Sequence, residues 1–325
     1  MDWRELLGNI ISNPVERERI ANEIGVHSVT LVRWVNGETS PRSHNLRQLI
    51  RAVPKQYRAQ LRAALDTTIN VSAADFETVL TQAELPYKLI MEVLDARANT
   101  PDLLRFWSIT RIILPEALKQ LDVERLGMII TVVRCMPPTK DGKIHSLRET
   151  VGQGTGPWSG SLEEKALLLG AESLAGYVTS SCRLEQVGDL RSNRTFLPAY
   201  QGEHEISAVA CPIMRACRVA GCLLFSSTQP DYFASQVYLE LVSAYTRLIA
   251  LAFDASDFYN PDIIDLRIMP PLEVQQIHIS SFRQRVIKLM QESTNGSQRL
   301  ASTQAEQMVW QQFEELLLNL PRSTS

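Results

Sequence analysis

Two short helical patterns on either side of Gly25 limit what the amino-terminal part of this chain can fold into. The stretch VERERIANEI ends at Gly25, and SVTLVRWVN begins soon afterwards at Ser28. Glycine suits the left-handed conformation in which helices often end, and Asn36-Gly37 is a similar stop signal. Leu31 and Trp34 fall on one face of the second pattern. We therefore expect two helices joined by a tight turn, with Leu31 and Trp34 in the core.

The predicted helix from Ser28 also carries residues that a core does not need. Its remaining faces bear Ser28, Val29, Val32, Arg33 and Asn36. A helix fits the major groove of DNA, where arginine can bind guanine through two hydrogen bonds, serine can bond several base edges and valine can touch a thymine methyl. This pattern favours a DNA-reading helix. A plain three-helix packing module, in which Arg33 is merely solvated, remains the alternative.

Charge is distributed unevenly along the chain. Residues 1–65 contain ten Lys/Arg and six Asp/Glu, whereas residues 66–325 contain 23 and 30. No acidic residue lies between Thr39 and Leu65, a stretch that contains Arg42, Arg47, Arg51, Lys55, Arg58 and Arg62. Such a run is either a solvated face or a set of phosphate contacts. We predict phosphate contacts for Arg42 and Arg47.

The stretch ERIANEIGVHSVTLVRWVNGETSP resembles the helix-turn-helix of the phage-repressor family, often called XRE-type, over residues 3–55. The matching features are IA, GV, TL, the aromatic Trp34, NG and the following proline. The resemblance implies base contacts from Ser28, Val29 and Arg33, and phosphate contacts from Arg17, His27, Asn36 and Arg42. The chain departs from the family at Val29 and Val32, where polar residues are more usual. Sequence discrimination would therefore depend on Arg33.

The middle of the chain changes from a helical to a strand period at Gly127. Residues 66–122 are predicted to be helical, with 66–99 as a linker, and the apolar stripe of Leu104, Trp107, Ile112, Leu118 and Leu121 is either a dimer seam or core. Further on, strand patterns occur in MIITVVRCM, KIHSLRETVG and RLEQVGDL, and a hairpin pattern occurs in ISAVACPIM and VAGCLLFSS. Helical patterns occur in SLEEKALLLGAESLAGYVTSS and SQVYLELVSAYTRLIALAF. Antiparallel strands flanked by helices predict an α+β domain over residues 100–255.

This region looks like a GAF domain. The resemblance depends on the stretch from Gly176 to Asp189, on Pro212 and Gly221 of the hairpin, and on the long closing helix. The resemblance implies a sensor module with a ligand pocket and dimerisation through terminal helices. Candidate pocket residues, with loop surface as the alternative, are Arg148, Trp158, Tyr177, Arg191, Arg194 and Tyr200. The signatures of cyclic-nucleotide-binding and bilin-binding GAF domains are missing, so we expect no known cofactor and leave a small-molecule ligand open.

The five cysteines have no metal-ligand spacing and fit a reducing compartment. If Ala216-Cys217 is a two-residue hairpin turn, Cys211 lies opposite Cys222. These three cysteines are then either a thiol sensor, with Arg215 and Arg218 beside Cys217, or structural residues and an incidental surface thiol. Free methionine sulfoxide reductases also use a GAF fold with several cysteines. However, the chain shows no nucleophilic triad, metal cluster or phosphate loop, so we do not expect an enzyme.

Residues 256–325 are expected to be a linker, DASDFYNPDIIDLRIMPP, followed by a hairpin of two helices at Leu272–Gln291 and Ala301–Leu320. The apolar stripes of these helices should dock on the GAF-like body or on a second copy. No apolar run is long enough to span a bilayer, and MDWRELLG is not a signal-peptide pattern.

Together these patterns predict a multidomain, cytoplasmic bacterial transcription regulator. Its parts are a helix-turn-helix domain (1–65), a helical linker (66–99), a GAF-like domain (100–255) and a helical extension (256–325). The expected partners are double-stranded DNA and a second copy, with RNA polymerase as a further candidate. The alternative is an adaptor whose helix-turn-helix binds protein.

Overall fold

The computed structural model describes residues 3–24, 26–39, 84–158, 167–191, 204–294 and 301–320, together with 41, 45, 49, 52–54, 56–58, 60, 61 and 64. The chain divides into two compact units, Met1–Gln82 and Ala83–Ser325. Most of the expected linker lies outside the described residues. Its last part, residues 87–99, is a helix that belongs to the second unit.

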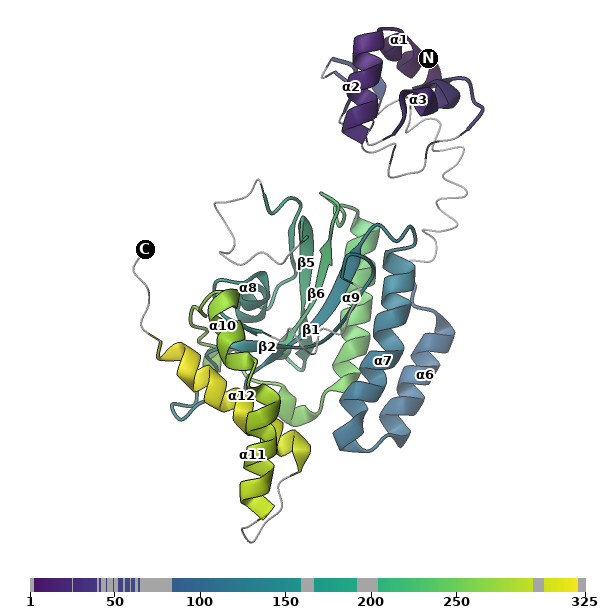
Figure 1. The fold of residues 1–325 in the computed structure, drawn as a ribbon. Helices are drawn as coiled ribbons and strands as arrows, with labels where there is room; N and C mark the ends of the chain where they lie inside the picture. The colour runs from purple at the N-terminus through teal and green to yellow at the C-terminus, as the bar shows by residue number, and fades with distance from the viewer. Residues whose placement is uncertain are drawn as a thin grey trace. The chain divides into compact units, whose positions relative to one another are not determined.

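The first unit contains the helices α1 (Trp3–Ile11), α2 (Pro14–Ile24) and α3 (Ser28–Val35) (Figure 1). The side chain of Asn13 accepts a hydrogen bond from the Val15 amide (3.0 Å) and so caps α2. The helix α3 ends at Asn36, and Gly37 follows with a φ of +74°, as the sequence predicts. The core contains Trp3, Leu6, Leu7, Ile10, Ile11, Ile20, Ala21, Ile24, Leu31, Trp34, Leu49, Ala52, Val53 and Leu61.

The second unit is built on an antiparallel sheet, which confirms the predicted α+β class. The strand order is β3-β2-β1-β6-β5-β4, and each neighbouring pair is antiparallel. The strands are β1 (Met128–Cys135), β2 (Leu147–Gly154), β3 (Leu168–Leu169), β4 (Glu185–Val187), β5 (Ser207–Arg215) and β6 (Arg218–Ser227).

Helices cover both faces of this sheet (Figure 1). One face packs against α7 (Asp102–Leu121) and α9 (Gln236–Ile249) around a core that includes Phe225 and Tyr245, and α6 (Tyr87–Asn99) packs on α7. The other face packs against α8 (Leu174–Ser181). In the stripe left open by the sequence, Leu118 and Leu121 are buried core residues, Trp107 and Ile112 pack against that core, and Leu104 is exposed.

Where two helices were expected after residue 271, the described residues form three: α10 (Leu272–Ile279), α11 (Phe282–Thr294) and α12 (Ser302–Leu318). The expected helix Leu272–Gln291 is interrupted at Ser280 and Ser281, whose hydroxyls donate to the carbonyls of the preceding turn. The buried Gln275 of α10 both accepts from and donates to the backbone of Leu168 (2.9 and 2.8 Å). These two hydrogen bonds give the backbone N–H and C=O of Leu168 partners on the edge of β3 that faces away from β2.

Two other expectations about this unit are wrong. The apolar LLL run was predicted to be helical, but it supplies strand β3. One edge of this strand pairs with β2, and the backbone of Leu168 forms hydrogen bonds with Gln275. The expected linker after α9 is packed along the sheet: the Ile144 amide donates to the Ile263 carbonyl, and the Val219 amide donates to the Tyr259 carbonyl (both 2.9 Å). It contains short 3-10 turns at Ala255–Asp257 and Pro261–Ile263.

Candidate functional site

The outward face of α3 is the first candidate site. Leu31 and Trp34 are buried, and the Arg4 guanidinium donates to the Trp34 carbonyl (3.2 Å), which ties α3 to α1. Val29 is 52% exposed, the side chain of Arg33 is 59% exposed, and Ser28 is half-buried. The predicted base-reading residues thus lie on a helix anchored from its opposite side.

Three of the residues predicted to touch phosphate lie in the described part of the chain. His27 and Asn36 are exposed at its two ends, and Arg17 is half-buried on α2. Arg42 and Arg47 lie outside the described residues. The nearby Arg19 was not among the predicted contacts. It forms ion pairs with Glu16 and Glu23 (both 2.7 Å) and donates a hydrogen bond to the Ala52 carbonyl.

Glu38 is a member of this surface that the sequence reasoning missed. Its carboxylate lies 3.9 Å from Arg33 Nε and accepts a hydrogen bond from the Asn36 amide group (3.1 Å). Both partners were predicted to contact DNA. The position of Glu38 just after Asn36-Gly37 was the available signal, because the turn brings its side chain back towards α3.

Four of the predicted pocket residues are described, and each has different surroundings. Arg148 lies on β2 with its guanidinium 5.1 Å from the ring centre of Trp310 on α12, and burial lowers the pKa of Arg148 to about 10. Trp158 packs edge-on against His204, Tyr177 is exposed on α8, and Arg191 binds Asp189 (2.9 Å). Arg194 and Tyr200 lie outside the described residues.

A small hollow lies between α8 and the sheet. It has a volume of about 20 Å³, room for roughly one water molecule, and its lining includes Leu169, Ser173, Leu174, Glu205 and Leu224. Pockets for drug-sized ligands measure about 300–1,000 Å³. Nearby on the same unit, burial together with the charge of Glu205 raises the pKa of Glu149 to about 8. The sequence reasoning missed both carboxyl groups.

The cysteine pairing expected from the hairpin is wrong. Ala216 and Cys217 do form the turn, with φ angles of 48° and 62°, and Arg215 pairs with Arg218. A bulge between Ile213 and Met214 then shifts the register by one residue, so Cys211 pairs with Leu223 and Cys222 with Pro212.

The shift places the two thiols in different environments. Cys211 belongs to the core beneath α7 and α9, whereas Cys222 belongs to the core beneath α8. Burial raises the pKa of both thiols, which opposes thiolate formation. Cys217 is exposed in the turn.

A buried histidine cluster joins the connection between β1 and β2 to the carboxy-terminal segment. The ring nitrogens of His145 face the Asp265 carbonyl and the Asp141 carboxylate (both 2.8 Å). Next to it, the Ser146 hydroxyl donates to Glu314 on α12 (2.6 Å), and burial raises the pKa of Glu314. Sequence spacing gave no signal for this cluster, because Asp265 and Glu314 lie more than a hundred positions from His145 and Ser146.

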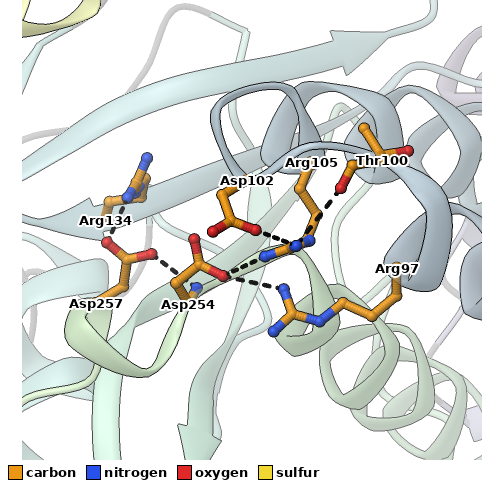
Figure 2. A network of polar contacts seen from close by, with 7 residues as sticks. All are labelled: Arg97, Thr100, Asp102, Arg105, Arg134, Asp254 and Asp257. Carbon is orange, nitrogen blue, oxygen red and sulfur yellow. Dashed lines mark hydrogen bonds and ion pairs between the residues drawn. The ribbon is translucent and has the colours of Figure 1, made fainter.

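A second polar network joins α6 and α7 to the segment after α9 (Figure 2). One oxygen of Asp254 accepts from Arg97 (3.1 Å) and Arg105 (2.6 Å), and Arg105 also contacts Asp102. Asp257 binds the Asp254 amide and, on its other oxygen, Arg134 (both 2.9 Å). The network acts as a structural junction between elements that are distant in sequence.

Two other kinds of site are absent from the described residues. In those parts of the chain, none of the helices combines the length and hydropathy that a membrane crossing requires. The same residues contain no group of three or more His, Cys, Asp or Glu side chains placed to hold a metal ion.

Neither protein-family models nor curated proteins match this sequence. Among solved structures, the chain is similar to the GAF domain of an Acinetobacter phosphoenolpyruvate-protein phosphotransferase (13% identity, TM-score 0.36, 51% of this chain and 90% of that one). It is also similar to a putative GAF sensor protein from Burkholderia vietnamiensis (14% identity, TM-score 0.35, 55% of this chain and 92% of that one). A third similar structure is the type II free methionine-R-sulfoxide reductase of Thermoplasma acidophilum (15% identity, TM-score 0.34, 49% of this chain and 98% of that one). Likeness at this level assigns neither a family nor an activity to the chain.

Proposed function

We propose that this protein is a homodimeric, DNA-binding transcription regulator. Its amino-terminal unit is a helix-turn-helix of the XRE type that reads DNA through α3, and its second unit is a GAF-type regulatory module. The observation that carries the proposal is the two-sided character of α3: Leu31 and Trp34 anchor it, while Val29 and Arg33 face solvent. Catalysis is not part of the proposal.

The charge distribution supports a DNA partner. Residues 1–65 have an excess of basic residues although the whole chain has a formal net charge of -3. Basic side chains that neutralise phosphates release counterions, which makes DNA affinity fall as salt rises. Arg33 is suited to bidentate recognition of guanine, and its exposed guanidinium makes a long contact of 3.9 Å with Glu38. Specificity and general affinity would thus come from different residues.

The proposed regulatory signal acts on the second unit. A disulfide between Cys211 and Cys222 is disfavoured, because the bulge separates them onto different faces. Oxidation of that pair is therefore not the proposed signal, and we propose a small molecule in its place. A coupling free energy of about 1–3 kcal/mol between ligand and DNA sites would be ordinary for an allosteric protein.

One feature favours a second candidate function, an adaptor whose α3 binds another protein. Val29 is an exposed apolar residue at a position where DNA-reading helices of this type more often carry a polar one. An apolar contact of this kind suits a protein groove as well as a thymine methyl. Salt dependence separates the two functions, because phosphate contacts are far more sensitive to salt than an apolar interface.

The test begins with selection of binding sequences from random DNA duplexes by the full-length protein. Fluorescence anisotropy then measures affinity for a selected and a scrambled duplex at several salt concentrations. We expect Arg33→Ala to reduce the preference for the selected duplex by about 5- to 150-fold, the value of one bidentate base contact. Arg111→Ala, at an exposed arginine on α7, is the matched control and should leave both affinities unchanged.

Three results would count against the proposal. The first is failure of the selection to enrich any sequence. The second is an affinity that does not respond to salt, which would favour the adaptor. The third is an Arg33→Ala variant that keeps both affinity and preference, which would show that α3 does not read DNA.

A further inference from the structure

The helix α6 has an apolar stripe on the side that faces away from its own core. Leu89 and Val93 are buried against the second unit, whereas Tyr87 is 77% exposed and Met91 and Leu94 are each 46% exposed. Ala98 continues the exposed series. The spacing of four, three and four residues is that of the apolar positions in a two-stranded coiled coil. Single exposed apolar residues are ordinary, but a repeated series on one helix face indicates an interaction surface.

We propose that this stripe of Tyr87, Met91, Leu94 and Ala98 pairs with the same stripe of a second copy of the chain, with the two α6 helices antiparallel. The pairing deepens the proposed function, because it names the surface that joins the two copies. The chain enters α6 directly from the residues that follow the amino-terminal unit. Dimerisation along α6 would therefore link the two DNA-reading units close to their point of attachment.

Side-chain size favours an antiparallel pair over a parallel one. In an antiparallel pair the large Tyr87 lies opposite the small Ala98 of the second copy, at both ends of the seam. Met91 then lies opposite Leu94 of the second copy, twice around the central turn. In a parallel pair each residue would meet its own copy, so two Tyr87 rings would crowd one end and two Ala98 methyls would leave a gap at the other.

The charges beside the stripe are also self-complementary. Lys88 and Asp95 lie seven residues apart on the same flank of α6, and the side chain of Lys88 is 87% exposed, 3.7 Å from Glu92 of its own helix. In the antiparallel arrangement Lys88 lies beside Asp95 of the second copy, and two-fold symmetry forms this pair twice. The pairs and the apolar layers centre on the same turn of α6, so one register satisfies both.

The size of the surface sets the expected strength of the dimer. A helix of 13 residues is about 20 Å long at roughly 1.5 Å per residue. Two such helices bury less than the roughly 800 Å² per partner of a standard interface. We therefore expect dimerisation at micromolar concentrations, and stronger association when both copies bind one DNA duplex.

Sedimentation velocity of the full-length protein, without DNA, tests the proposal over about 1–100 µM. We expect Met91→Glu to raise the dimer dissociation constant at least about tenfold. Ile277→Glu is the matched control, since Ile277 is 72% exposed on α10, and it should change the constant less than about twofold. Leu94→Glu replaces Met91→Glu if that variant does not fold.

Charge reversal tests the antiparallel register. Lys88→Asp should weaken the dimer by about fivefold, because it places like charges together twice. The double variant Lys88→Asp, Asp95→Lys should restore the dissociation constant to within about twofold of the wild-type value. Circular dichroism melts of each variant confirm that the monomer is folded.

The proposal is overturned if the wild-type protein stays monomeric, if both seam variants dimerise normally, or if the double variant does not recover. It is also overturned if Met91→Glu lowers the melting temperature of the monomer without affecting association, since the stripe would then be covered by the chain itself. Arg33→Ala should leave the dissociation constant unchanged. Failure of this dimer would therefore leave the DNA-reading role of α3 to be judged by its own experiment.

Discussion

At the scale of single residues, Glu38 opposes the DNA contacts proposed for its neighbours. Its carboxylate lies beside Arg33 and Asn36 on an exposed surface, where an ion pair at 3.9 Å adds little stability. If α3 binds DNA as proposed, a negative charge at this place would repel the phosphate backbone and compete for the guanidinium of Arg33. Glu38 would thus weaken DNA binding while leaving the fold intact.

We therefore expect Glu38→Gln to tighten DNA binding by about three- to tenfold at low salt, with a smaller gain at high salt. Anisotropy titrations of the wild-type and variant proteins on the same duplex measure the change. Glu124→Gln, at an exposed glutamate of the second unit, is the control. An unchanged affinity for the Glu38 variant would place this residue, and with it the carboxyl end of α3, away from the DNA.

His145 shows how one buried side chain connects two parts of the second unit. Burial lowers the pKa of His145, but the hydrogen bonds to the Asp265 carbonyl and the Asp141 carboxylate outweigh it, and the net shift is upward from 6.5. Both partners are acceptors, so the ring donates from both nitrogens only when it is protonated. Arg267 opposes the positive charge, whereas Asp141 favours it.

A raised pKa makes this contribution to stability dependent on pH. The contribution is fully present below pH 6.5, the ordinary value, and is lost as pH rises through the higher pKa of the folded state. We expect His145→Gln to lower the melting temperature by about 2–6 °C near pH 6, with a smaller difference from wild type near pH 9. Because burial raises the pKa of Glu314 as well, the comparison uses the difference between the two proteins at each pH.

His278→Gln, on α10, controls for the loss of a histidine from the carboxy-terminal helices. If the difference between the wild-type protein and His145→Gln were the same at all pH values, His145 would not be protonated in the folded state.

At the scale of elements, the hairpin of β5 and β6 is set by a close approach of two backbones. Gly221 has a φ of +137°, and a Cβ atom there would lie 2.0 Å from the Val133 carbonyl oxygen of β1. It lies next to the bulge that shifts the register of the hairpin, and it pairs with Arg134 of β1 and Ile213 of β5. Glycine at this position therefore permits both the bulge and the pairing of β6 with its neighbours.

We expect Gly221→Ala to destabilise the second unit by more than about 3 kcal/mol, because the clash is with rigid backbone. Gly142→Ala is the matched control: Gly142 has a φ of +76° but no atom within 4 Å of the added Cβ. It should cost about 1 kcal/mol from backbone conformation alone. Urea denaturation measures both values, and equal losses would show that the contact with Val133 is unimportant.

The same hairpin shows how far the sequence could predict this structure. The β-branched and apolar runs predicted β1, β5 and β6, and Ala216-Cys217 was correctly placed in the turn. The bulge was not predictable from local pattern, because it depends on packing against β1. A hairpin without the bulge would place Cys211 opposite Cys222, and for this reason the predicted cysteine pairing was wrong. Periodicity likewise predicted α2 and α3, since each buries a face in the core of the first unit.

Long-range polar contacts account for most of what the sequence did not predict. The pairing of Gln275 with the edge of β3 and the cluster at His145 join residues more than a hundred positions apart. Arg148 was expected in a ligand pocket, but its stacking on Trp310 depends on where α12 docks. The residues of the α3 face were predictable because they lie on one short helix whose buried side is evident.

At the scale of the whole molecule, Asp254 joins the α6–α7 pair to the segment that follows α9. Its side chain is 39% exposed and binds two arginines, whereas Asp102 is 76% exposed and binds only one of them. Removal of the central acid leaves Arg97 and Arg105 without their shared partner, and Arg105 is largely buried. An interaction of this kind with a partly buried charge is worth about 1–3 kcal/mol, while an exposed pair is worth less than about 1 kcal/mol.

We expect Asp254→Asn to increase hydrogen–deuterium exchange at least about tenfold in peptides from α6 and the start of α7, since a loss of about 1.4 kcal/mol corresponds to that factor. Peptides from α1 to α3 should exchange as in the wild-type protein, because they belong to a separate compact unit. Asp102→Asn is the control and should have little effect on either region. Faster exchange in α1 to α3 would show that the two units are energetically coupled, and this coupling would give a signal at the second unit a direct route to the DNA-reading helix.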